Sequence, residues 1–295
     1  MTELTDGVVT LHLRREQEGA HLFTVAAGGT EVGSVCADEQ PDGRARLTWE
    51  LAPDFTGRGY ATLAVRLLVD YAFRALHLER VEALVDPADE RAVRVATRAG
   101  LRREGVLRGL GATADGREDK VVLARLATDP PITDAGGFRA LLNSFLPRKR
   151  AIAQLLVRDP EGRVLLCRLT YKNDEDLPGG VVEVGESPQL AVAREVQEEL
   201  GLTLTAGPLL LTDWLPPWGG WDDALCLVFD GGVVDPSVLD ASVLQAREIR
   251  SVQFCTLEEV RARCADFTAG RVEAALRALQ AGGPTYTESG RGEPA

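Results

Sequence analysis

The sequence predicts an α/β (α+β) protein of two domains, each a mixed sheet flanked by helices. At 295 residues the chain reaches the size, about 250–300 residues, at which single cores stop growing. Its apolar content of 45% is enough for two cores. The stretch "LATDPPITDAGG" interrupts the apolar periodicity with Pro, Gly, Asp and Thr. We therefore expect a first domain over residues 1–130, a linker over 131–137, a second domain over 138–282 and a flexible tail over 283–295.

The composition excludes several classes of function. The net charge is −12 and neither half carries a basic stripe, so duplex nucleic acid is not an expected partner, because its binding depends on Lys and Arg at phosphates. No apolar run reaches the roughly 18 residues of a membrane span, and the acidic opening lacks the apolar region of a signal peptide. An odd number of scattered cysteines without a CxxC pair is typical of reduced thiols, which predicts a cytoplasmic protein. The cysteines are Cys36, Cys167, Cys226, Cys255 and Cys264.

The first domain shows strands and helices in alternation. The stretch "LTWELAPDFTGRGYATLAVRLLVDYAFRAL" predicts a strand over residues 47–51, a glycine-containing turn and an amphipathic helix. A second strand follows over residues 81–85, then a turn and a helix over about residues 89–99 that Gly100 caps. Another strand comes after this glycine. The order predicts a mixed central sheet flanked by helices.

The turn "GRGYA" lies where the first strand leads into the helix N-terminus. Successive backbone N–H groups at such a turn form a concave anion site, and the helix dipole strengthens it. Glycines there let the backbone approach a diphosphate closely. The same letters also suit a plain strand-to-helix turn, so the motif alone leaves both interpretations open.

Two stretches favour the diphosphate interpretation, "GRGYAT" and "VDPADERAVRVATRAGLRREG". Together with the order of elements over residues 11–126, they resemble the GNAT N-acetyltransferases, especially the branch with protein N-terminal acetylating members. The resemblance implies a GNAT fold, acetyl-CoA as co-substrate and an amine acceptor of unknown identity. It also implies that one run of backbone binds the cofactor pyrophosphate, namely Gly57, Arg58, Gly59, Tyr60 and Ala61.

Three positions depart from the GNAT pattern. Thr56 stands where the pattern has Gln or Arg before the turn, and Asp89 stands where it commonly has an Asn that touches the cofactor. The tyrosine that often acts as general acid corresponds to Ala96, which excludes that form of acid catalysis. An ammonium must still lose a proton before it attacks a thioester. Our candidate base is Glu50, directly or through water, and the alternative is an exposed strand glutamate without a role.

The second domain is expected to open with a short helix, "FRALLNSFL", followed by a hairpin of "AIAQLLV" and "VLLCRLTY". An acidic helix comes next, and then three further strand-like runs and two helical stretches. The loop "PPWGGWDD" carries Trp218 and Trp221, which could stack on a nucleobase or pack at an interface. The polar, glycine-rich end "AGGPTYTESGRGEPA" predicts a loose tail.

The acidic helix is expected over residues 188–200, with Ser187 as N-cap and Gly201 as a left-handed cap. At roughly 100° per residue, its three glutamates share one face, while Leu190, Ala193, Val196 and Leu200 share the opposite face. The three are Glu195, Glu198 and Glu199. Like charges at such spacing destabilise a helix, so a bound cation is expected. Oxygen ligands without His or Cys favour Mg²⁺ or Mn²⁺ over zinc, and the alternative is a solvated acidic face.

The loop before this helix supports the metal interpretation. Gly180, then Glu186 after five residues, then "REVQEELGL" after seven more resemble the Nudix box of the Nudix hydrolases. The resemblance implies an α/β/α sandwich and makes Glu195, Glu198 and Glu199 the metal ligands. It implies that Arg194 and Glu186 form the pair that holds loop and helix in register. The backbone at Gly179 and Gly180 would approach the metal.

The combined prediction is a bifunctional protein. By resemblance, the second domain would cleave a diphosphate linkage in a nucleoside diphosphate derivative with Mg²⁺ (or Mn²⁺), and the first would acetylate an amine. The base that activates water is open among Glu198, Asp222, Asp223 and Glu248. The leaving group is open among a nucleotide sugar, a damaged nucleoside triphosphate, a dinucleotide and CoA. Two alternatives remain, a Nudix hydrolase with a non-catalytic CoA- or partner-binding first domain, and a metabolite-sensing regulator.

Overall fold

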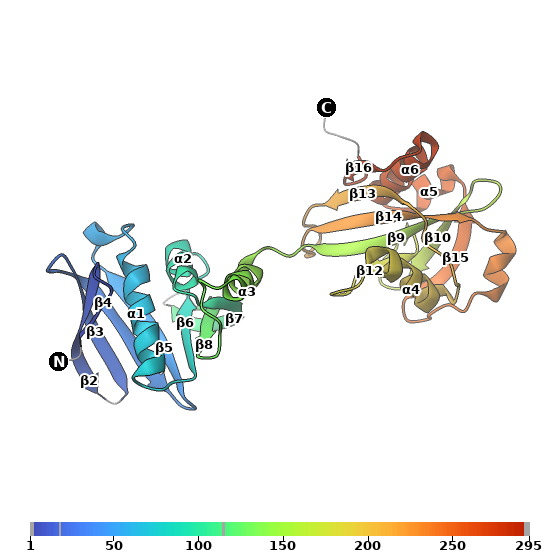
Figure 1. Cartoon of the computed structure of the whole chain (residues 1–295). Helices are drawn as coiled ribbons and strands as arrows, with labels where there is room; N and C mark the ends of the chain where they lie inside the picture. Colours follow the sequence, from blue (N-terminus) through green and yellow to red (C-terminus); the bar gives the residue numbers. More distant parts are fainter. Residues whose placement is uncertain (1–2, 18, 114–115, 292–295) are drawn as a thin grey trace. The chain divides into compact units, whose positions relative to one another are not determined.

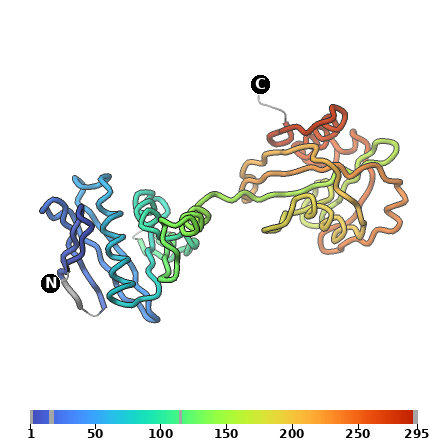
Figure 2. The backbone as a smooth tube through the Cα atoms, in the orientation of Figure 1, coloured from blue at the N-terminus to red at the C-terminus, as the bar shows by residue number. Residues whose placement is uncertain are grey.

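The computed structural model describes residues 3–17, 19–113 and 116–291. The chain divides into two compact units, Met1–Pro147 and Arg148–Ala295, each with its own sheet (Figure 1). Figure 2 follows the backbone through both units from the blue N-terminus to the red C-terminus. Among the described residues, none of the helices combines the length and the apolar composition that a membrane span requires.

The first unit is built on one mixed sheet. Among its described residues, the sheet has eight strands in the order β1-β2-β3-β4-β5-β6-β8-β7. Neighbouring strands are antiparallel except for β5 and β6, which are parallel. The strands are β1 (Glu3–Thr5), β2 (Val9–Gln17), β3 (Ala20–Ala27), β4 (Thr30–Gln40), β5 (Arg44–Leu51), β6 (Arg80–Val85), β7 (Arg102–Thr113) and β8 (Gly116–Leu126). Both strands predicted over residues 47–51 and 81–85 are confirmed, as parts of β5 and β6.

Helix α1 (Tyr60–Arg74) covers one face of this sheet (Figure 1). Its buried side chains share a core with the inward residues of β3 and β5, such as Phe23 and Leu47. Helix α2 (Glu90–Arg98) adds Ala96 to the same core, and a 3-10 turn, η1 (Pro53–Phe55), precedes α1. The strands of this core alternate inward and outward side chains, as a half-covered sheet requires.

The parallel strands β5 and β6 separate part-way along their length. Arg44 pairs with Arg80 and Arg46 with Glu82, but β5 continues to Leu51 without a further partner in β6 among the described residues. The chain then turns into α1 at this open end. A cavity at this open end is lined by the last residues of β5 and the first turn of α1.

The predicted linker and domain boundary are wrong. Helix α3 (Ala135–Phe145), which contains "FRALLNSF", packs against β7 and belongs to the first unit. Leu141 is buried there, and Ser144 Oγ accepts a hydrogen bond from the backbone N–H of Arg103 at 3.1 Å. The polar stretch before α3 was expected to mark the end of a domain, but it is a connection within one. The boundary lies instead between Pro147 and Arg148.

The second unit is also built on a mixed sheet. Its described residues give the strand order β11-β10-β9-β14-β13-β16, with β12 beside β9 and β15 beside β10. Strand β14 runs parallel to β9, and β16 runs parallel to β13. The strands are β9 (Arg150–Arg158), β10 (Val164–Leu169), β11 (Glu175–Asp176), β12 (Gly179–Val181), β13 (Leu209–Leu215), β14 (Ala224–Val233), β15 (Ile249–Cys255) and β16 (Thr285–Glu288).

Two layers of helix cover the two faces of this sheet, with α4 (Pro188–Leu200) and α6 (Asp266–Ala281) on opposite sides (Figure 1). The side chains of β9 alternate between two cores: Leu155 packs with the α4 residues and Leu156 with the α6 residues. A short helix α5 (Leu257–Arg263) and a 3-10 turn η2 (Pro236–Ala241) complete the unit. The predicted α/β/α sandwich is therefore confirmed.

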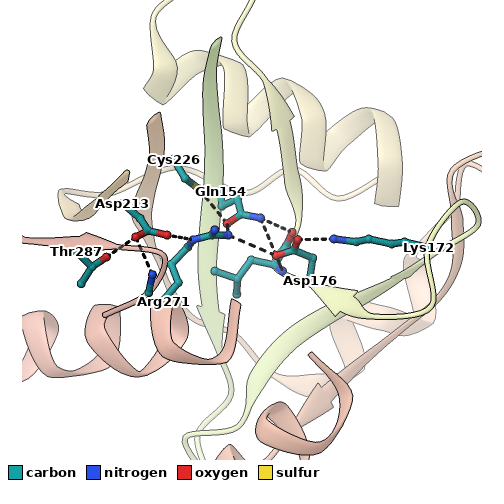
Figure 3. Close-up of polar contacts among 9 residues, drawn as sticks. Gln154, Lys172, Asp176, Asp213, Cys226, Arg271 and Thr287 are labelled. Atoms are coloured by element: carbon teal, nitrogen blue, oxygen red, sulfur yellow. Dashed lines mark hydrogen bonds and ion pairs between the residues drawn. The ribbon is translucent and has the colours of Figure 1, made fainter. Parts of the chain in front are cut away.

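The predicted flexible tail is wrong over residues 285–291. Strand β16 extends the sheet at β13, and its Thr287 is buried. Thr287 Oγ1 and the Gly290 N–H both donate to Asp213 Oδ1, at 2.7 and 2.9 Å. Residue Asp213 is 0% exposed, and the Arg271 Nε of α6 donates to its other oxygen at 2.9 Å (Figure 3). Asp213 and Arg271, which lie far from residues 285–291 in the sequence, thus hold this polar segment in place. The segment has too little apolar surface to pack by itself.

This buried network continues across the sheet. Arg271 Nη1 donates to Gln154 Oε1 at 2.9 Å, and Gln154 Nε2 donates to Asp176 Oδ1 at 2.8 Å. Lys172 Nζ donates to Asp176 Oδ2 at 2.6 Å at the outer end (Figure 3). Each buried charge therefore meets an opposite charge or a hydrogen-bond partner, which offsets the cost of its desolvation.

Candidate functional sites

The second unit presents its acidic residues on α4 and the loop before it. The helix has the predicted bounds, with Pro188 in its first turn and Gly201 in the left-handed conformation at φ 69°. The predicted faces need correction, because Leu190 is 66% exposed and Glu199 is buried at 6% exposure. Glu199 turns toward the sheet and accepts a hydrogen bond from the Gly179 N–H at 3.3 Å.

Arg194 connects the helix to the preceding loop. Its Nε and Nη2 donate to the two oxygens of Glu186, at 2.9 and 3.0 Å, in a bidentate pair. Glu186 Oε2 also accepts the N–H of Glu183, which ties the loop to itself. The third nitrogen, Nη1, lies 3.0 Å from carboxylate oxygens of both Glu195 and Glu198. Arg194 thus holds the loop against the helix and neutralises part of the acidic face.

Glu195 lies directly against the glycine turn. A Cβ placed on Gly180 would come within 2.5–2.9 Å of the Glu195 carboxyl group, and one on Gly179 within 2.1 Å of the Ala153 carbonyl oxygen. Gly179 has φ 137°, a conformation that other residues rarely adopt. Only glycine therefore allows this carboxylate to lie on the backbone of the loop.

The cluster carries more negative charge than Arg194 balances. Burial raises the pKa of Glu199 to about 7, against the opposing Gly179 hydrogen bond, and the charges of Glu195 and Glu248 act in the same direction as burial. Burial also raises the pKa of Glu195, with further contributions from Glu198 and Glu248. The charge of Glu248, which precedes β15, thus acts on both glutamates.

The other sequence candidates lie apart or face solvent. Glu198 is on the outer side of α4 and bonds to Arg194. Asp223 pairs with Lys149 at the β13–β14 loop, and Asp222 is exposed in the same loop. Of the four candidate bases, Glu198 contacts Arg194, and Glu248 acts on Glu195 and Glu199 through its charge. Across the described residues, no group of three or more His, Cys, Asp or Glu side chains is already arranged around one cation position.

The first unit has a cavity of about 470 Å³ at the open end of β5. Gly57 and Gly59 of the predicted turn line it, both with positive φ, at 76° and 84°. Gly59 is the N-cap of α1, and in the described structure no side chain caps this helix end. Ala61 also lines the cavity, whereas Arg58 and Tyr60 do not. The free N–H groups of a first helical turn thus face a space that is large enough for a ligand.

The opposite wall of this cavity comes from α2. Asp89 caps the helix, because its Oδ1 accepts hydrogen bonds from the backbone N–H groups of Arg91 and Ala92, at 3.1 and 2.9 Å. Asp89 also lines the cavity. Three arginines of α2 also line the cavity, and the sequence reasoning missed them. They are Arg91, Arg94 and Arg98. Their spacing of three and four residues, visible in "RAVRVATR", puts them on one helix face.

Glu50 lies where two hollows meet. It lines the large cavity and also a smaller hollow of about 150 Å³ on β3, β4 and β5, whose wall includes Ser34, Cys36 and Thr48. Trp49 is the other residue that both spaces share. Ala96 is fully buried in the core and offers no titratable group, as predicted.

Family comparisons assign the two units. A family model described as Acetyltransferase (GNAT) domain matches residues 3–102, and one described as NUDIX domain matches residues 147–276. The chain joins a GNAT domain to a Nudix domain. The start of the NUDIX match agrees with the boundary between the two compact units.

Curated relatives match each domain separately. The GNAT domain is 36% identical over 93 residues to the uncharacterized N-acetyltransferase p20 of Bacillus licheniformis, covering 30% of this chain and 52% of that protein. The Nudix domain is 37% identical over 60 residues to the 8-oxo-dGTP diphosphatase of Escherichia coli (strain K12), covering 19% of this chain and 46% of that protein. The chain thus spans about half the length of these relatives. A solved MutT protein from Methanosarcina mazei Go1 shows 25% identity with a TM-score of 0.39, over 46% of this chain and 98% of that one.

The residues of the Nudix domain fit a divalent cation. Carboxylate oxygens are the preferred ligands of Mg²⁺ and Mn²⁺. Burial raises the pKa of Glu195 and of Glu199, and neighbouring carboxylates raise it further, so a bound cation would stabilise the ionised forms of both groups. Gly180 leaves open the space beside Glu195 that any side chain would fill.

Proposed function

We propose that the Nudix domain is a Mg²⁺- or Mn²⁺-dependent hydrolase of a diphosphate linkage in a nucleoside diphosphate derivative. The observation that carries the proposal is the packing of Glu195 and Glu199 on the Gly179–Gly180 turn, beside the Arg194–Glu186 pair. Glu195, Glu198 and Glu199 would hold the cation, which would neutralise phosphate charge and lower the pKa of a bound water.

The chain's own residues supply the remaining roles. A carboxylate takes the proton of the attacking water, and our candidates are Glu198, which pairs with Arg194, and Glu248, whose charge acts on Glu199. The water oxygen bonds to phosphorus while the bridging oxygen leaves with its electron pair. Arg194 keeps Glu186 and the loop in place during these events through its bidentate pair. The match to a relative named 8-oxo-dGTP diphosphatase supports the same reaction class.

The test is a screen of nucleoside diphosphate derivatives with the full chain and Mg²⁺, with both products identified by mass. Release of a phosphate-containing product from at least one nucleotide, abolished by chelation, is the expected result. A folded chain that binds nucleotides without cleaving any of them would support the sensing alternative.

A second function is favoured by the cavity of the first domain. We propose that it binds acetyl-CoA, with the pyrophosphate at the N-terminus of α1 and the arginines of α2, and transfers the acetyl group to an amine. The amine nitrogen bonds to the thioester carbonyl carbon, and the CoA thiolate leaves. Glu50 takes the amine proton directly or through water, because it lines both the cavity and the hollow beside it.

Acetyl-CoA consumption against a panel of amines, with mass identification of acetylated products, tests this second function. We expect Glu50→Gln to lower the acetylation rate without weakening acetyl-CoA binding. Binding without transfer to any amine would assign the domain a CoA-binding role only.

A further inference from the structure

The segment between β10 and α4 changes its strand partner immediately before the glycine turn. Its first part, β11, pairs with β10, and its second part, β12, begins at Gly179 and pairs with β9. Among the described residues, Leu177 and Pro178 lie between these two strands and belong to neither. This crossing (residues 177–178) lacks the regular ladder of a strand, so its backbone groups need other partners.

Hydrogen bonds from two sources hold the crossing. The Leu177 N–H donates to Asp176 Oδ1 at 2.9 Å, and the Leu155 N–H of β9 donates to the Pro178 carbonyl oxygen at 3.0 Å. Gln154 Nε2 donates to the same Asp176 oxygen at 2.8 Å (Figure 3). Asp176 Oδ1 therefore joins the crossing to a side chain of β9.

Arg271 determines which way the Gln154 amide points. Arg271 Nη1 donates to Gln154 Oε1 at 2.9 Å, and the Cys226 thiol donates to the same oxygen at 3.2 Å. Arginine has donors only, so the amide turns its oxygen to Arg271 and its NH2 group to Asp176. Asp213 fixes the guanidinium in turn, because it accepts the bond from Arg271 Nε.

Asp176 stays ionised in this setting. Burial raises the pKa of its carboxyl, but the charges of Lys172 and Arg271 and the hydrogen bonds of Lys172 and Gln154 outweigh burial, so the pKa lies below its ordinary value. An ionised carboxylate only accepts hydrogen bonds. It therefore retains the Leu177 N–H and the Gln154 amide as donors.

Strand β9 separates this network from the acidic cluster. Its side chains alternate between the two faces of the sheet, so Gln154 lies with Arg271 on the α6 face, while Ala153 and Leu155 pack with residues of α4. The network can therefore reach the acidic cluster through the backbone of the crossing.

The glycine turn follows the crossing directly. Gly179 is the next residue after Pro178, and its N–H donates to Glu199 at 3.3 Å. The Gly180 backbone lies against the Glu195 carboxyl group, which a Cβ there would meet at 2.5 Å. A displacement at the crossing would thus move the backbone that both carboxylates contact.

A contribution to stability alone does not account for this network. Burying charged and amide groups costs free energy, and well-packed apolar side chains of similar volume often stabilise a core equally well or better. The network nevertheless runs from Arg271 through Gln154 to Asp176, which holds a backbone N–H of the crossing. This end point favours a role in placing that backbone.

We propose that Arg271, Gln154 and Asp176 are positioning residues of the cation site. They act through the crossing, which places the backbone that Glu195 and Glu199 contact. The inference rests on the proposed hydrolase function and extends it to residues on the opposite face of the sheet. Cation binding should weaken when the bond from Gln154 to Asp176 is lost, although Gln154 is uncharged and lies on that opposite face.

The test measures Mn²⁺ binding to the full chain by calorimetry, with the variant Gln154→Glu. The new carboxylate still accepts from Arg271 but cannot donate to Asp176. We expect the Kd for Mn²⁺ to rise at least about fivefold, and hydrogen exchange of the Leu177 and Gly179 amides to become at least about fivefold faster. The added charge alone would have the opposite effect on the Kd, because a carboxylate attracts a cation.

Two further variants isolate the lost bond. Gln154→Met, which is uncharged and similar in length, also removes the donor and should change both measurements in the same direction. Gln253→Glu is the matched control, because Gln253 Nε2 donates to the neighbouring β11 carboxylate of Glu175, at 3.1 and 3.2 Å. In the described structure, Glu175 makes no hydrogen bond to the crossing. This control should keep the Kd and the exchange rates within about twofold.

Several results would overturn the positioning role. A Kd for Mn²⁺ within about twofold of the unaltered chain in the folded Gln154 variants would do so, as would tighter binding in Gln154→Glu or an equal loss in Gln253→Glu. Faster amide exchange with an unchanged Kd would also overturn it, because the network would then hold the crossing without affecting the cation site.

The positioning role and the hydrolase function fail in different ways. An unaltered chain that binds no Mn²⁺ would refute both. Mn²⁺ binding and hydrolysis that persist unchanged in the Gln154 variants would refute the positioning role and leave the hydrolase function in place.

Discussion

In the GNAT domain, the proposed diphosphate site combines a helix N-terminus with Arg91, Arg94 and Arg98. In the Nudix domain, the corresponding residues are carboxylates, and burial raises the pKa of Glu199 to about 7. Both sites would receive the same anionic group, yet their charges are opposite. Holding a diphosphate requires only positive charge from the protein, whereas cleaving it requires a cation that carboxylates bind. The comparison predicts that the two sites respond differently to salt concentration, to removal of metal and to mutation.

The largest expected effect comes from the buried network of the Nudix domain. Arg271→Ala leaves Asp213 as an unpaired buried charge, so we expect the free energy of unfolding of this domain to fall by about 3–5 kcal/mol. Its Tm should drop by roughly 10 °C, while acetyl-CoA binding to the GNAT domain stays within twofold. Calorimetric unfolding in parallel with acetyl-CoA titration checks both expectations.

The control lies on the same helix. Arg277 is 64% exposed and pairs with Glu273, so Arg277→Ala should cost less than about 1 kcal/mol. Equal losses in the two variants would show that the network around Arg271 does not hold the domain together.

The next effect concerns the acidic cluster. Glu195→Gln and Glu198→Gln each keep size and helix propensity while removing one ligand charge. We expect hydrolysis to fall at least about a hundredfold with the fold intact. Glu183→Gln, an exposed change in the preceding loop, should leave the rate within twofold. Wild-type rates in the two folded helix variants would remove these residues from the site.

A smaller effect is expected in the GNAT cavity. Arg94 lines the cavity but is 56% exposed and pairs with Glu90, so Arg94→Ala should raise the Kd for acetyl-CoA by only about fivefold. The loss should shrink as salt rises, because exposed charges are screened. Titration calorimetry at two salt concentrations measures this. Arg108→Ala, on β7 outside the cavity lining, is the matched control, and equal losses in both variants would refute the assignment.

The smallest effect is expected from separating the domains. Residues 1–147 and 148–295, made as two proteins, should both fold, because each unit has its own sheet and core. The second piece should hydrolyse substrate within about threefold of the full chain, equivalent to less than 1 kcal/mol in the transition state. Activity of the separate pieces and the full chain is compared at equal concentration. A soluble second piece that binds Mg²⁺ and hydrolyses nothing that the full chain hydrolyses would contradict this.

Local sequence patterns were sufficient to predict most helices and strands of both domains. The bounds of α4 follow from Pro188 and Gly201, because helix ends depend on the preferences of single residues. Ser187 is the N-cap by position, but in the described structure its side chain makes no cap hydrogen bond. The pairing of Arg194 with Glu186 followed from the resemblance and is confirmed as a bidentate contact. The metal roles of the glutamates stay predictions.

The errors arose where one segment depends on a distant one. The polar run at residues 285–291 looks like a tail by composition, but Asp213 and Arg271 hold it in the sheet. Helix α3 looks like the start of the second domain, but it packs on β7. Neither partner is recognisable from the segment itself.

The sequence by itself determined the two-domain α/β class, the glycine turn of the GNAT domain and the glutamates of the Nudix helix, because these depend on spacing within a few turns of chain. The tertiary structure alone decided that Glu199 is buried, that Glu50 lies between two hollows and that Arg150 stacks on Trp221. Burial and charge pairing depend on which strands and helices come together in space, and that information is distributed over the whole chain.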